Sequence, residues 1–133
     1  MKPRKTLPFA LPILLLAFAA VPAAAEDAAP AGPATKVEAK KVCMVNDALF
    51  QKDQIPVEVE GKTYYGCCEM CKARLAQDAA ARSSVDPVTG ATVDKATAVP
   101  GALADGSVLY FESEKTLEEY NRTAVESAEA EQG

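Results

Sequence analysis

Residues 57–75 read Val-Glu-Val-Glu-Gly-Lys-Thr-Tyr-Tyr-Gly-Cys-Cys-Glu-Met-Cys-Lys-Ala-Arg-Leu, and this stretch decides the fold. The alternation at its start is typical of a half-buried strand, Gly61 supplies a turn, and the residues after it return as a second strand. A short helix is predicted next, over about 68–81. The local unit is therefore a hairpin that runs into a helix whose first turn carries cysteines.

The chain has four cysteines and no histidine. Cys43 stands upstream of the hairpin, and Cys67, Cys68 and Cys71 cluster at the predicted helix start. Residues four apart on a helix have Cβ atoms about 5–6 Å apart, so Cys67 and Cys71 can share one metal ion, with Cys43 as the third ligand. We expect the helix N-terminus to lower the thiol pKa values there and favour the thiolate. Cys68 is expected to face away, but its spacing to Cys71 is also that of a recurrent metal-binding pair.

Two methionines adjoin these cysteines: Met44 follows Cys43, and Met70 precedes Cys71. Thiolate and thioether ligands select soft or borderline metals, and no imidazole is present to act as a ligand or a base. We expect Cu(I) in a three-thiolate site, and Zn(II) if Cys68 completes a set of four. The alternative for both methionines is packing in a small core.

Residues 1–25 have the pattern of a cleavable signal peptide. Three basic residues precede an apolar run and a stretch of small residues, which predicts cleavage between Ala25 and Glu26. We therefore expect an exported protein, periplasmic or secreted, with no stable membrane anchor after cleavage. Residues 26–39 are rich in Ala and Pro and are expected to form a disordered linker.

The charge of the chain is acidic, with 14 Lys and Arg against 19 Asp and Glu. Three of the basic residues and none of the acidic ones lie in residues 1–25, so the remainder carries a net charge of −8. This sign argues against nucleic acid and anionic membrane surfaces as partners.

A second, cysteine-free copy of the same pattern follows the first. Residues 61–75 align with residues 106–120 through a glycine, a tyrosine and a glutamate. In this alignment Thr89, Glu112 and Thr116 take the places of Cys43, Cys67 and Cys71. Cys43 and Cys67 are 24 residues apart, and Thr89 and Glu112 are 23 residues apart. Matched spacing of this kind favours an internal duplication.

The two copies predict an α+β protein made of two small ββα units. The boundaries are 40–82 for a metal-binding unit, 83–122 for a degenerate unit without cysteines, and 123–133 for an acidic tail. The second helix is expected over 113–122, with Ser113 as its N-cap. Units of this size have thin cores and often depend on a metal or on disulfides.

These residues resemble the TRASH/YHS family of small heavy-metal-binding domains. The resemblance covers residues 40–120. It rests on the cysteines together with residues 61–67 and, in the second copy, residues 86–90 and 93–98. It implies a treble-clef-like ββα fold and a role in metal trafficking, resistance or sensing. It also implies Cys43, Cys67 and Cys71 as ligands. The protein partners that follow from it are a cuproenzyme, a metal-efflux protein or a sensor.

Two other functions fit the cysteines. An even number of cysteines in a small exported domain is typical of a disulfide framework, which would give an interaction domain without metal. Cys68 and Cys71 form a CxxC pair, as in thiol–disulfide oxidoreductases, but the βαβ context of those enzymes is absent. The carboxylates show no arrangement suited to acid–base work and there is no phosphate-binding loop, so we expect a protein that is not an enzyme.

Overall fold

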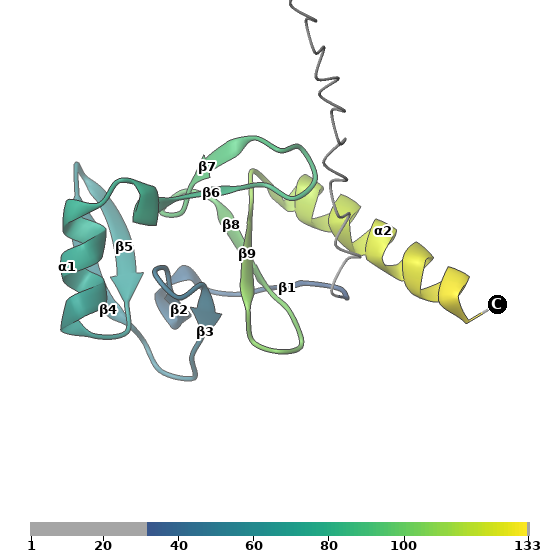
Figure 1. The fold of residues 1–133 in the computed structure, drawn as a ribbon, viewed down its shortest axis with the longest axis horizontal. Coiled ribbons are helices and arrows are strands. Elements are labelled where there is room, and N and C mark those ends of the chain that lie inside the picture. The colour runs from purple at the N-terminus through teal and green to yellow at the C-terminus, as the bar shows by residue number, and fades with distance from the viewer. Residues whose placement is uncertain (1–31, 133) are drawn as a thin grey trace, which may run out of the picture.

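A computed structural model describes residues 32–132 (Figure 1). The predicted signal peptide and the first part of the predicted linker lie outside these residues. The described part is a mixed α+β structure with small antiparallel sheets and two α-helices, which confirms the predicted class. No helix in this part is long and apolar enough to cross a membrane.

The first half begins with two short strands and continues with a hairpin and a helix. Its elements are β2 (Val42–Cys43), β3 (Ala48–Leu49), β4 (Ile55–Val59), β5 (Lys62–Gly66) and α1 (Glu69–Gln77). The predicted hairpin is confirmed, since β4 and β5 pair in antiparallel register around the turn. Glu60 and Gly61 both have positive φ there, which matches the twist of a tight hairpin.

Helix α1 is shorter than the predicted range of 68–81. The backbone becomes extended at Asp78, and its carboxylate accepts a hydrogen bond from the Ala80 N–H at 2.9 Å. Arg82 donates to the Leu75 carbonyl at 2.6 Å, so a last-turn carbonyl is satisfied by a side chain. A short 3₁₀ turn over Ala80–Arg82 takes the place of the expected final helical turn.

The second half has the same order of elements. They are β6 (Ser83–Val85), β7 (Thr92–Asp94), β8 (Val99–Ala102), β9 (Val108–Phe111) and α2 (Glu114–Glu131). Ser113 is the N-cap of α2, as predicted, and forms a capping box with Thr116. The helix does not end at 122 but continues through residues predicted as a tail. Ala and Glu are good helix formers, and Ala124 is buried.

The predicted disordered linker is wrong for its described part, where β1 (Thr35–Lys36) adds a third strand to the β8–β9 sheet. Just before it, the Ala34 N–H and C=O hydrogen-bond the side chain of Asn121 on α2, at 2.7 and 2.9 Å. Ala34 is buried against Phe111 and Leu117. The alanine- and proline-rich composition does not reveal this strand because its hydrogen-bond partners lie far along the chain.

The larger hydrophobic core is built from both halves. Val42, Tyr64 and Leu75 of the first half share it with Val93 and Tyr110 of the second. In Figure 1 the β4–β5 hairpin and α1 lie at one end of the molecule and α2 extends from the other, with β2, β3, β8 and β9 between them. The loop that follows β2 therefore lies where the two halves meet.

Candidate metal centre

Three cysteines from different elements converge at one point. Cys43 ends β2, Cys67 follows β5, and Cys71 lies in the first turn of α1. Their Sγ atoms all lie within 4.8 Å of one another, and those of Cys67 and Cys71 are 3.7 Å apart. Sulfurs that each lie about 2.3 Å from a shared ion are separated by roughly 4 Å. The three thiols can therefore hold one metal ion.

Backbone pairing brings Cys43 to the helix. The Met44 N–H donates to the Tyr65 carbonyl at 2.8 Å, which docks the loop of residues 43–47 (the Cys43 loop) beside the end of β5. Gly66 then lets the chain pass close to α1, because a Cβ there would lie 3.0 Å from the Cβ of Cys71. Asn46 of the same loop donates to the Cys67 sulfur at 3.5 Å.

Cys68 lies outside this group of three. It is exposed and is the N-cap of α1, and its sulfur accepts a hydrogen bond from the Cys71 N–H at 3.5 Å. This is the position that Ser113 occupies at the start of α2. All four cysteines are free thiols in the described part of the chain.

The predicted lowering of the thiol pKa values at the helix N-terminus is wrong for two of the three converging cysteines. Burial, together with hydrogen bonds to Cys68 and Cys67, raises the pKa of Cys71 to about 12. Hydrogen bonding to Cys43 and burial also raise the pKa of Cys67. The helix N-terminus acts on the N-cap instead, since the Cys71 N–H lowers the pKa of Cys68.

Cys43 differs from its two neighbours. Burial acts to raise its pKa, but hydrogen bonds from the backbone N–H groups of Asn46 and Val45 outweigh this and lower it. The Cys43 loop thus favours the thiolate of Cys43 among the three converging cysteines, Cys43, Cys67 and Cys71 (the triad). A metal ion must displace protons from the other two thiols, so binding strengthens as the pH rises.

The two methionines have different environments. Met44 is fully buried in the larger core, so its side chain packs as the alternative interpretation predicts. Met70 is 83% exposed on the first turn of α1 and packs against no core.

Lys95, to which the sequence assigns no individual role, holds the Cys43 loop from the second half. Its ammonium donates to the Met44 carbonyl at 2.7 Å and to the Asp47 carboxylate at 2.6 Å. It also lies 5.0 Å from the centre of the Tyr110 ring, and it is only 5% exposed. The Val108 N–H donates to the Asp47 carbonyl at 2.8 Å. The second half therefore positions Cys43, one of the three converging cysteines.

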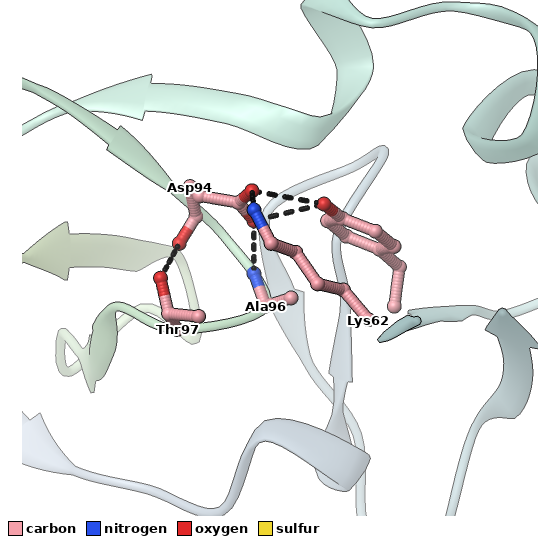
Figure 2. A network of polar contacts seen from close by, with 5 residues as sticks. Lys62, Asp94, Ala96 and Thr97 are labelled. Atoms are coloured by element: carbon pink, nitrogen blue, oxygen red, sulfur yellow. Dashed lines mark hydrogen bonds and ion pairs between the residues drawn. The ribbon is translucent and has the colours of Figure 1, made fainter. Parts of the chain in front are cut away.

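A second polar link joins the hairpin of the first half to β7 (Figure 2). Asp94 accepts from the Lys62 ammonium at 2.7 Å and from the Tyr64 hydroxyl at 2.9 and 3.0 Å. The Ala96 N–H donates to the same carboxylate at 2.9 Å, and the Thr97 hydroxyl donates to the Asp94 carbonyl at 3.3 Å. This network links the β4–β5 hairpin of the first half to β7 of the second.

In the second half, Thr89, Glu112 and Thr116 take the places of the three cysteines. A hydrogen-bonded carboxylate, Asp86, lies beside them. Thr89 donates to the Glu112 side chain at 2.8 Å. The fully buried Asp86 accepts backbone N–H bonds from Val88 and Glu112, both at 2.7 Å. Burial acts to raise the pKa of Asp86, but these bonds and the Thr116 hydroxyl lower it below its ordinary value.

Asp86 should therefore stabilise the protein in a pH-dependent way. Its lowered pKa makes a contribution that is present above about pH 4 and is lost as the pH falls through the folded-state value. We expect Asp86→Asn to lower the free energy of unfolding by about 2–4 kcal/mol at pH 7, because buried N–H groups lose a charged acceptor. Urea unfolding should show that the difference in the free energy of unfolding between parent and variant becomes smaller below about pH 4. Asp105→Asn, at an exposed turn, should barely shift the midpoint, and a gap that is constant with pH would contradict this role.

Comparison with known proteins assigns no family to this chain. No family model, curated protein or solved structure matches it. Three cysteines of the site lie close enough together to hold one metal ion, and this is what the chain itself offers as a clue to function.

Proposed function

We propose that this protein binds a soft metal ion through the thiolates of Cys43, Cys67 and Cys71. The observation that carries the proposal is the convergence of three sulfurs from separate elements to within 4.8 Å of one another. Thiolates select soft and borderline metals. The chain has no histidine that could add an imidazole ligand.

Cu(I) fits this donor set better than Zn(II). Structural zinc sites are almost always four-coordinate and tetrahedral, whereas the group that the structure brings together has three sulfurs. The fourth thiol, Cys68, is engaged at the start of α1. A soft monovalent ion accepts a low-coordinate, all-sulfur site.

The role proposed for the bound metal is trafficking, resistance or sensing in an exported protein that is not an enzyme. Support comes from the pattern of residues 1–25, from the resemblance to the TRASH/YHS family, and from the order of elements that recurs in both halves. We propose that the halves are tandem treble-clef-like units, of which the first binds metal and the second holds the Cys43 loop. A cuproenzyme, an efflux protein or a sensor would be the partner.

The test is to isolate the exported protein without reductant and measure its metal content and its thiols. We expect about one soft metal ion per chain, because a bound metal keeps thiolates occupied in an oxidising compartment. Denaturation in chelator and an alkylating agent, followed by intact-mass measurement, should show four alkylated cysteines. Stripping the metal in air should then produce disulfides and abolish rebinding. Freshly isolated protein with two disulfides and no metal would favour the disulfide-stabilised domain instead.

A further inference from the structure

Cys67 is the most exposed of the three cysteines in the triad. Cys43 is 0% exposed and Cys71 8%, whereas Cys67 is half-buried. Solvent and an incoming ligand therefore meet the triad first at Cys67.

Two further exposed sulfurs follow Cys67 within three residues. Cys68 follows Cys67 directly and is exposed, and Met70 is the most exposed large hydrophobic side chain among residues 32–132. The side chains next to them on α1, Glu69 and Lys72, are charged and exposed, so Met70 belongs to no apolar patch. Both sulfurs are soft ligands of the same class as the triad.

Capping of α1 does not require a thiol at position 68. The Cys68 sulfur accepts one long hydrogen bond, 3.5 Å from the Cys71 nitrogen. At the start of α2, the Ser113 hydroxyl accepts the equivalent bond from the Thr116 N–H at 3.4 Å. Serine is among the preferred N-cap residues. A long hydrogen bond to a sulfur holds the Cys68 side chain only weakly, so this exposed sulfur can leave the cap to bind a metal ion.

We propose that Cys68 is a transfer ligand, through which the metal passes between the triad and a partner that offers thiolate or thioether ligands. This inference rests on the proposed function. In the step, the metal–sulfur bond to Cys67 breaks as a bond to the Cys68 thiolate forms. The Cys68 proton passes to the Cys67 thiolate, and the metal keeps its oxidation state. Met70 then contacts the metal from the solvent side while the partner's sulfur replaces the remaining triad ligands.

The test loads the full chain with Cu(I) and follows transfer to a synthetic peptide carrying two cysteines by stopped flow. We expect Cys68→Ser to slow transfer by about tenfold, while its Cu(I) affinity, measured against a chromophoric chelator, falls by less than about threefold. Met70→Leu, which keeps the size of the side chain but loses the ligand, should also slow transfer. Val125→Ser, at an exposed position on α2, should transfer at the parent rate.

The outcomes separate this inference from the proposed function. A parent protein that binds no Cu(I) overturns both. If Cys68→Ser binds and transfers Cu(I) at the parent rate, the transfer ligand is overturned and the metal site stands. If Cys68→Ser loses as much affinity as Cys67→Ser, Cys68 is a permanent fourth ligand and the transfer role is again overturned. Circular dichroism should show that Cys68→Ser keeps α1, because serine is a good N-cap.

Discussion

Replacing Cys43 with serine should lower the affinity for Cu(I) by about 100-fold or more. Loss of an outer-shell partner alone typically reduces metal affinity 10–100-fold, and Cys43 is a direct ligand in the proposed site. The effect should be large because the other two thiols have raised pKa values, so the site loses the thiol that ionises most easily. Competition with a chromophoric Cu(I) chelator measures the change.

The matched control is Cys68→Ser, which removes a thiol from the same region but not from the triad. Its affinity should fall far less than that of the Cys43 variant. Because Cys43 is fully buried, Cys43→Ala should be measured beside Cys43→Ser to separate loss of the ligand from burial of a hydroxyl. Parent-like affinity in both Cys43 variants would show that the site lacks the proposed geometry.

Replacing Lys95 with methionine should lower the free energy of unfolding of the reduced, metal-free protein by about 2–3 kcal/mol. The variant leaves the buried Met44 carbonyl without its donor, and an unsatisfied buried group costs about 1–3 kcal/mol. It also leaves the Asp47 carboxylate unpaired, but that side chain is 41% exposed and can be hydrated. The expected loss is therefore below the 3–5 kcal/mol typical of a fully buried pair.

The same variant should weaken Cu(I) binding by roughly tenfold, since Lys95 orients the loop that carries Cys43 and loss of a supporting contact typically weakens metal binding 10–100-fold. Urea unfolding followed by far-ultraviolet circular dichroism measures stability, and chelator competition measures affinity. Lys62→Met is the matched control, because it breaks a 2.7 Å ion pair whose partners are both partly exposed. It should change both quantities much less. Equal effects of the two variants would contradict the special role of the buried lysine.

Local signals made part of the fold predictable. The hairpin around Gly61 follows from strand alternation and a glycine turn, and the start of α2 follows from Ser113 as an N-cap. Cys67 and Cys71 do come together, but Cys67 precedes the N-cap of α1, so the end of β5 and not helical spacing places its sulfur. Each of these features depends on residues within a few positions of one another.

Contacts between distant segments were not predictable in this way. β1 exists because Thr35 pairs with Ala102, 67 residues further along. In the sequence, Lys95 resembles an ordinary surface lysine, but in the structure its buried ammonium donates to the carbonyl of Met44 in the Cys43 loop. The pKa values of Cys67 and Cys71 depend on burial and on neighbouring thiols, which the spacing of cysteines does not reveal. Such features need the packed structure of both halves.

Ala34 and Asn121, 87 residues apart, hydrogen-bond to each other, so the fold closes only after α2 has been made. During synthesis from the N-terminus, the three cysteines of the triad are exposed before Lys95 and Val108 of β9 are available to anchor the Cys43 loop. A stalled or truncated chain therefore carries reactive thiols without a finished site. We expect metal to be retained only after the last third of the chain has folded back onto the first, so that metal loading distinguishes complete molecules from unfinished ones.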